Sequence, residues 1–201
     1  MGRRGFQTFS HSKHQHTEGK HRFEHWYRDN TVYFITARVR DGLHAFESDD
    51  AIAIFWDRFD HWTSSFGFVP WVTTLMVNHY HTLGYLKVGA NLGTMMQRIH
   101  GSVAKLVNDT LDKRHLPFWR TDGVKDYFDG CLRDEKQCRL AYRYTLMQAV
   151  RAGVVDDHRD YPDTHVNIDL EVGLKRALQL KAFMMGIPYD RYDRGKRGGA
   201  R

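Results

Sequence analysis

Residues 73–87 read TTLMVNHYHTLGYLK, and the fold of the whole chain is inferred from this stretch. Its apolar and β-branched residues predict a strand in which His79 and His81 are separated by one residue. Side chains alternate between the two faces of a strand, so residues two apart point the same way at roughly 6.6 Å. The two imidazoles are therefore placed to bind one metal ion, while Tyr80 packs on the opposite face. Two hydrogen-bonded polar histidines without a metal would give the same pattern.

The segments around this run alternate between strand and helix patterns. Strands are predicted at residues 31–40, 68–77, 81–88 and 126–132, and helices at residues 48–65, 92–111, 135–151 and 168–185. Ser48 and Asp134 are the predicted N-caps, and Gly67 and Gly153 are predicted to end helices. The order β-α-β-β-α-β with a closing helix predicts an α+β fold of ferredoxin-like (RRM-like) type. Such a fold is an antiparallel sheet with helices on one or both faces.

The excess positive charge of the chain lies at its two ends. Residues 1–25 carry five Lys/Arg against two Glu, residues 188–201 carry five against two Asp, and the remainder balances at twenty against twenty. We therefore predict a basic, His-rich flexible tail (1–25), a catalytic domain (26–162), a C-terminal helical extension (163–187) and a second basic flexible tail (188–201). Basic tails around a neutral core suit a polyanionic partner, although tails that only solubilise the protein look the same.

Composition also indicates the compartment. No apolar run approaches the ~20 residues that span a membrane, and no apolar segment follows the adjacent arginines near the N-terminus. Cys131 and Cys138 are the only cysteines, at a spacing that fits no zinc motif, and they give no disulfide framework. We expect a soluble cytoplasmic protein without membrane contact, associated with the nucleoid if it binds DNA.

A second group of candidate residues lies in the predicted helix 135–151. Tyr144 and Gln148 are four residues apart and so share one helix face. The amide oxygen of Gln148 is a hard ligand that Mg²⁺ or Mn²⁺ accepts when phosphate oxygens complete the coordination shell. A divalent cation beside Tyr144 would favour the phenolate and polarise a phosphate, which suits phosphoryl transfer. Tyr142 is the competing candidate, but it lies about 200° around the helix, so at most one of the two tyrosines faces the metal.

Taken together, these motifs resemble those of a known family. VNHYHTLGYL (residues 77–86) resembles the His-hydrophobe-His motif of the HUH single-tyrosine transposases. FWR (118–120), DYFDGCLRDEKQ (126–137) and Tyr144–Gln148 followed by VRAGVV resemble downstream landmarks of the insertion-sequence-200-like and REP-associated tyrosine transposases. The similarity covers roughly residues 26–162. Many REP-associated members read Tyr-Ile-x-x-Asn-Pro at the tyrosine, whereas this chain reads Tyr-Thr-Leu-Met-Gln-Ala, which is closer to the insertion-sequence-200 branch.

The resemblance implies a metal-dependent endonuclease and strand-transferase that acts on single-stranded or hairpin DNA. It implies that His79, His81 and Gln148 bind Mg²⁺ or Mn²⁺ and that Tyr144 is the nucleophile, which forms a 5′-phosphotyrosine and releases a 3′-hydroxyl. It also implies either a monomer or a homodimer that exchanges the tyrosine helix. Two alternatives remain: a domesticated, non-catalytic DNA-binding relative, and an HUH replication or mobilisation nickase, which the lack of a helicase or second domain disfavours.

Contacts with DNA are predicted between the two motifs. Residues 98–151 hold eleven Lys/Arg against seven acidic residues, although a solvated surface would account for each one taken singly. Arg120 and Arg143 are the preferred candidates for phosphate contacts, with Trp119 stacking on an unpaired base. Lys125 and Arg98 complete the predicted DNA-binding set.

Overall fold

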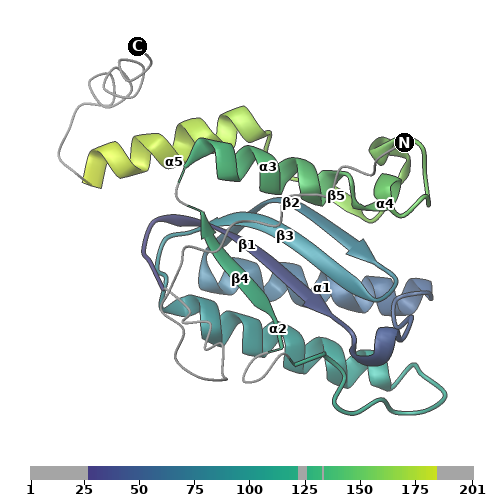
Figure 1. Ribbon diagram of the computed structural model, residues 1–201. Helices are drawn as coiled ribbons and strands as arrows, with labels where there is room; N and C mark the ends of the chain where they lie inside the picture. The colour runs from purple at the N-terminus through teal and green to yellow at the C-terminus, as the bar shows by residue number, and fades with distance from the viewer. Residues whose placement is uncertain (1–26, 122–125, 133, 185–201) are drawn as a thin grey trace, which may run out of the picture.

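The computed structural model describes residues 27–121, 126–132 and 134–184 (Figure 1). The predicted tails at residues 1–25 and 188–201, and Lys125, therefore lie outside the described residues. The elements in chain order are β1 (Thr31–Arg38), η1 (Arg40–Gly42), α1 (Asp49–Phe66), β2 (Phe68–Met76), β3 (His79–Leu86), α2 (Asn91–Asn108), β4 (Phe128–Leu132), α3 (Glu135–Leu146), α4 (Gln148–Arg151), η2 (His158–Asp160), β5 (Thr164–Val166) and α5 (Leu170–Met184).

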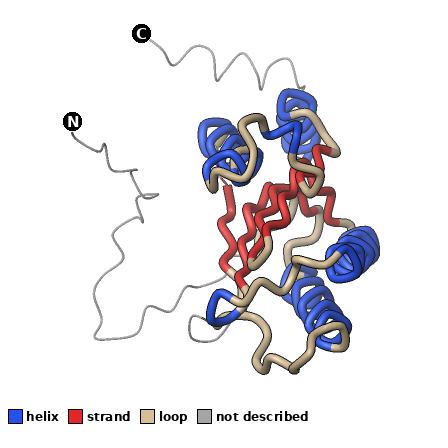
Figure 2. Tube along the Cα trace, turned by 90° about the vertical axis from the view of Figure 1, so that its right-hand side faces the viewer, coloured by secondary structure: helices blue, strands red, loops and turns tan. Residues whose placement is uncertain are grey.

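The five strands form one sheet in the order β4-β1-β3-β2-β5, and every neighbouring pair is antiparallel. Helices α1 and α2 cover one face of the sheet, and α3 and α5 cover the other (Figures 1 and 2). The predicted α+β fold, an antiparallel sheet with helices on both faces, is confirmed. β3 is the central strand, so its side chains are enclosed from both sides.

Two hydrophobic cores are formed where the two helical layers pack on the two faces of the sheet. Between the sheet and α1/α2, Tyr80 and Ile35 pack with Phe55 of α1 and Met95 of α2. Leu83 points to the other face and lies in the second core, with residues of α3 and α5. Around the histidine pair, the alternation along β3 therefore sends odd-numbered residues toward α3 and Tyr80 toward α1 and α2.

Helices α1 and α3 begin after their predicted N-caps, and α1 ends at Gly67 as predicted. The Ser48 hydroxyl accepts a hydrogen bond from the Ala51 amide at 3.2 Å, and the Asp134 carboxylate accepts one from the Gln137 amide at 2.8 Å. Gly67 ends α1 with a φ of +70°, a conformation that glycine adopts without steric cost. These bonds fix the orientation in which α1 leads into β2 and β4 leads into α3.

The structure differs from the predicted elements in several places. β5 was not predicted, because its three residues are too few to show alternation, and it pairs only with β2 at the edge of the sheet. α2 ends at Asn108 rather than at Leu111, since the Asn108 side chain donates to the Ala104 carbonyl and accepts from the His115 amide.

A buried polar network lies behind the central strand. The Tyr80 hydroxyl lies 2.9 Å from His100 Nε2, and His100 Nδ1 lies 2.8 Å from Asp126 Oδ2. The Trp119 indole stacks on the His100 ring at 4.4 Å and donates to the His100 carbonyl at 3.0 Å. This network ties β3 to α2 and to the segments on either side of residues 122–125. Within the described ranges, no helix is long and apolar enough to cross a membrane.

Replacing Tyr80 with Phe is expected to lower the free energy of unfolding by about 1–3 kcal/mol, because His100 Nε2 would lose its partner in a buried position. Urea denaturation measures the difference. Tyr85→Phe is the matched control: its hydroxyl donates to Asn30 Oδ1 at 2.6 Å in a half-buried position, where water can replace the bond. A loss below about 1 kcal/mol is expected there. Equal losses for the two variants would contradict the role given to the network.

Candidate functional site

His79 and His81 lie side by side on the face of β3 that is covered by α3. Their ring centroids are 5.1 Å apart and the rings are nearly perpendicular, at 81°. The Tyr80 ring between them in sequence is fully buried on the other face of the sheet. The structure thus has both histidines on one face of the strand, as predicted.

Neighbouring polar side chains fix the orientation of both imidazoles. His79 Nδ1 lies 2.7 Å from Asn78 Oδ1, and His81 Nδ1 lies 2.7 Å from the hydroxyl of Thr36. Thr36 is directly opposite His81 in the β1–β3 register, so the sheet itself supplies this partner. Hydrogen bonds at Nδ1 leave Nε2 of each ring as the atom available to a metal ion.

Burial and nearby positive charge keep both histidines neutral. Burial lowers the pKa of His79, the Arg38 guanidinium lowers it further, and a hydrogen bond with the Gln148 side chain partly opposes these effects. Burial lowers the pKa of His81 well below its usual value, and a positive charge on His79 when it is protonated, on Arg38 and on Arg151 acts in the same direction. A neutral imidazole is the form that binds a metal ion.

Tyr144 at the end of α3 reaches this pair of histidines within the same chain. Its ring centroid lies 5.1 Å from that of His81, edge to face at 86°, and 5.8 Å from that of Phe34. The Arg151 guanidinium lies 4.9 Å from the centre of the Tyr144 ring, within cation–π range. The competing candidate Tyr142 is buried in the second core, and its hydroxyl donates to the Ile168 carbonyl at 3.3 Å. Of the two tyrosines, it is Tyr144 that faces the histidines.

Gln148 joins the tyrosine to the first histidine. Its side chain is 9% exposed, its Nε2 donates to the Tyr144 carbonyl at 3.0 Å, and its side chain raises the pKa of the His79 imidazole. Because Nε2 is engaged, the carbonyl oxygen Oε1 is the atom that Gln148 can offer to a cation.

The helix that carries Tyr144 and Gln148 is interrupted, whereas a single helix was predicted for residues 135–151. α3 ends at Leu146 and α4 begins at Gln148, with Met147 outside helical geometry. The Thr145 carbonyl accepts a hydrogen bond from the Thr74 hydroxyl at 2.8 Å, and the Tyr144 carbonyl accepts one from Gln148 Nε2. Side-chain bonds to these two carbonyls compete with the helical ladder at this turn and account for the break.

The donor atoms at the site suit a divalent cation. Two imidazole nitrogens and one amide oxygen would leave coordination positions open for phosphate oxygens. In the part of the chain that the structure describes, no three His, Cys, Asp or Glu side chains group closely enough to hold a metal ion. A metal at this site would therefore depend on Gln148 and on oxygen atoms from outside the protein.

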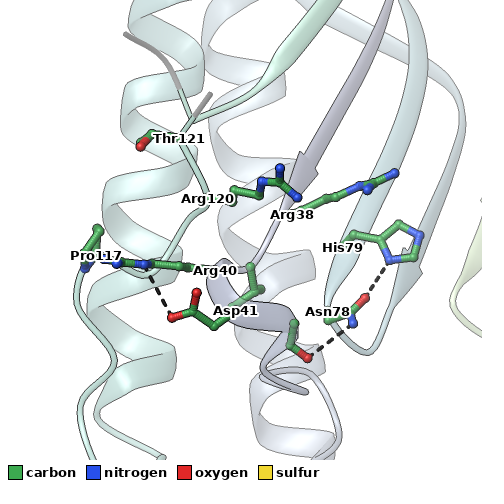
Figure 3. Close-up of a pocket in the computed structure, with 10 residues that line it drawn as sticks. Arg38, Arg40, Asp41, Asn78, His79, Pro117, Arg120 and Thr121 are labelled. Atoms are coloured by element: carbon green, nitrogen blue, oxygen red, sulfur yellow. Dashed lines mark hydrogen bonds and ion pairs between the residues drawn. The ribbon is translucent and has the colours of Figure 1, made fainter. Parts of the chain in front are cut away.

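A polar pocket of about 720 Å³ opens beside His79 (Figure 3). Its lining includes Arg38, Arg40, Asp41, Asn78, His79 and Arg120. Arg120, predicted from the sequence to contact DNA, thus lines the same pocket as His79. Arg38, which was not singled out from the sequence, faces His79 directly across the β1–β3 ladder. The alternation of residues 31–40 could have shown that Thr36 and Arg38 share the polar face of that strand.

The other residues of the predicted DNA-binding set lie elsewhere. Trp119 is only 4% exposed and packs in the core, which is at odds with its predicted stacking on an unpaired base. Arg98 lies on α2 with its guanidinium 5.7 Å from the centre of the Trp62 ring, in the layer on the other side of the sheet from the histidines. Arg143 is exposed on the last turn of α3, next to Tyr144. Lys125 lies outside the described residues.

Known proteins resemble this chain in structure rather than in sequence. The amino-acid sequence matches no protein-family profile and no curated protein. Among solved structures, the chain is similar to a REP-associated tyrosine transposase bound to a REP hairpin, with a TM-score of 0.56 and 14% identity over 77% of this chain and 82% of that one. The chain has the fold of this transposase. A candidate transposase from Deinococcus radiodurans R1 is more distant, with a TM-score of 0.41 and 11% identity over 54% of this chain and 84% of that one.

The stability of the protein is expected to decrease as the pH falls, because of the two histidines of this transposase fold. Their pKa values are lowered from 6.5 in the folded state, so the unfolded chain binds more protons as the pH drops through that value. The free energy of unfolding, measured by urea denaturation in the presence of a chelator, should therefore decrease between about pH 7.5 and about pH 5. His81→Asn should flatten this dependence, whereas His61→Asn, at an exposed position on α1, should leave it unchanged. An unaltered slope in His81→Asn would contradict the assignment.

Proposed function

We propose that this protein is a metal-dependent single-stranded DNA endonuclease and strand-transferase that acts in DNA transposition, with Tyr144 as its nucleophile. The observation that carries the proposal is the meeting of Tyr144, Gln148 and the two histidines within one chain. The likeness in fold to a transposase solved with a REP hairpin supports a hairpin or single strand of DNA as substrate. This similarity supports the proposal through the fold alone. The proposed chemistry rests on the residues of this chain.

The reaction exchanges one phosphate ester for another. The Tyr144 phenol gives up its proton as its oxygen attacks a DNA phosphorus atom, the bond from phosphorus to the 3′ oxygen breaks, and the 3′ oxygen takes up a proton to leave as a 3′-hydroxyl. The DNA 5′ phosphate is then esterified to Tyr144 as a 5′-phosphotyrosine. Attack by a 3′-hydroxyl on this ester reverses the step and joins the strands. Because the phosphotyrosine ester retains the free energy of the broken phosphodiester bond, the reaction needs no nucleotide cofactor.

The residues around Tyr144 hold the reacting groups in position. His79 and His81, through Nε2, and Gln148, through Oε1, would hold Mn²⁺ or Mg²⁺. The bound cation would polarise the phosphate and balance its charge. Asn78 and Thr36 keep the imidazole rings turned toward that position, and the Arg151 guanidinium packs on the Tyr144 ring. Residues fixed in this way reduce the reorganisation that the reaction requires.

A covalent protein–DNA adduct is the expected product when the full chain is incubated with labelled single-stranded hairpin DNA and Mn²⁺. Denaturing gel electrophoresis detects it, and Tyr144→Phe should abolish it because the nucleophilic oxygen is gone. Tyr142→Phe is the matched control on the same helix, with its hydroxyl directed to the Ile168 carbonyl, and it should still form the adduct.

An adduct that persists in Tyr144→Phe would rule out Tyr144 as the nucleophile. Absence of any adduct in the unmodified protein, with hairpin binding retained, would instead favour the non-catalytic DNA-binding relative.

Removal of a ligand or of its supporting partner should weaken Mn²⁺ binding. Gln148→Ala and Thr36→Val are each expected to lower the affinity about 10- to 100-fold, the first by deleting an oxygen ligand and the second by releasing the His81 ring. Isothermal titration calorimetry with Mn²⁺ measures the change. Gln97→Ala, at an exposed position on α2, is the matched control. Affinities equal to the control would exclude a metal at this position.

A further inference from the structure

The pocket beside His79 offers an unusual concentration of positive charge. Among the described residues that line it, three are arginines and one, Asp41, is acidic. Asp41 pairs with Arg40 at 3.4 Å, and both side chains remain largely exposed. Within the described ranges, no carboxylate forms an ion pair with Arg38, which is exposed at the end of β1. The balance of charge in the pocket therefore favours an anionic ligand.

Backbone pairing holds two of these arginines side by side. Val39 and Trp119 form an antiparallel bridge, in which the Arg120 amide donates to the Arg38 carbonyl at 2.8 Å and the Arg40 amide donates to the Phe118 carbonyl at 2.9 Å. Val39 and Trp119 are buried in the core, so Arg38 and Arg120, directly opposite each other, project away from it. Figure 3 shows both side chains lying over the same end of the sheet as His79.

The register of β1 and β3 continues this row into the candidate site. Arg38 is paired with His79, so the order across the sheet is Arg120, Arg38 and His79. The His79 imidazole is also a lining residue of the pocket. The pocket therefore borders the proposed position of the reacting phosphate, because His79 lies next to both. A volume of about 720 Å³ is ample for part of a polymer that continues out of the pocket.

We propose that this arginine pocket binds the backbone phosphates of the single DNA strand adjacent to the phosphate that Tyr144 attacks, with Arg38 and Arg40 as phosphate-binding residues alongside Arg120. This inference rests on the proposed function. Guanidinium groups bind phosphate oxygens through paired hydrogen bonds, and they do so without reading the base. The pocket sets the position of the strand on the protein, and base recognition is left to other contacts.

The test measures binding without cleavage. The full chain carrying Tyr144→Phe is titrated into a fluorescent 15-nucleotide oligodeoxythymidylate over a range of salt concentrations, without divalent metal. Adding Arg38→Gln or Arg40→Gln should weaken binding by about tenfold and should reduce the slope of log affinity against log salt by about 0.7 for each phosphate that the variant no longer binds. Arg58→Gln is the matched control, because Arg58 lies on α1 in the layer on the other side of the sheet and pairs with Asp57. It should change the affinity by less than about twofold.

Folding and catalysis are checked separately. Arg38 is exposed, so Arg38→Gln should leave the urea midpoint unchanged, and a variant that binds weakly with an unchanged midpoint supports the pocket. If Arg38→Gln and Arg40→Gln had the same affinity and salt slope as the Arg58→Gln control, the proposed phosphate-binding pocket would be wrong, even if wild type forms the Tyr144 adduct. If the arginine variants bind weakly while wild type forms no adduct, the pocket stands and the proposed function fails.

Discussion

The hydrogen bond from the Thr74 hydroxyl to the Thr145 carbonyl is the contact on which the arrangement of the site depends. It joins β2 to the end of α3 in a buried position, where a missing partner costs the most. Thr74 is also paired with His81 across the β2–β3 ladder. One residue therefore fixes both the strand that presents the histidines and the helical turn that presents Tyr144. Loss of this hydrogen bond would remove the direct bond between β2 and the helical turn that carries Tyr144.

Charge is distributed so that the site is neutral at its centre and positive at its margin. Burial keeps the imidazoles of His79 and His81 uncharged, while Arg38 and Arg151 lie close enough to lower the pKa of His81 further. A neutral ligand pair surrounded by guanidinium groups suits an anion that brings its own charge to the metal. In the protein without DNA, the positive charge of Arg38 has little effect on the free energy of folding, because this side chain stays exposed to water.

The sequence predicted what depends on local patterns and missed what depends on contacts between distant segments. The caps at Ser48 and Asp134 and the shared face of His79 and His81 follow from residues within a few positions of one another. The break at Met147 does not, because its cause includes a hydroxyl on a strand far away in the sequence. The burial of Trp119 likewise depends on its stacking against His100, a residue of α2 that is 19 positions away in the sequence. The partners of the two histidines required the register of the sheet, which no single strand specifies.

The most direct measurement for the central claim is a crystal structure of the full chain grown with Mn²⁺, with anomalous scattering used to locate the ion. The expected result is a single strong peak bonded to Nε2 of His79, Nε2 of His81 and Oε1 of Gln148, with the Tyr144 hydroxyl of the same chain facing it. Both imidazoles should retain their Nδ1 contacts with Asn78 and Thr36. A peak located elsewhere, or a histidine pair that stays free of Mn²⁺ at saturating concentration, would contradict the proposed site.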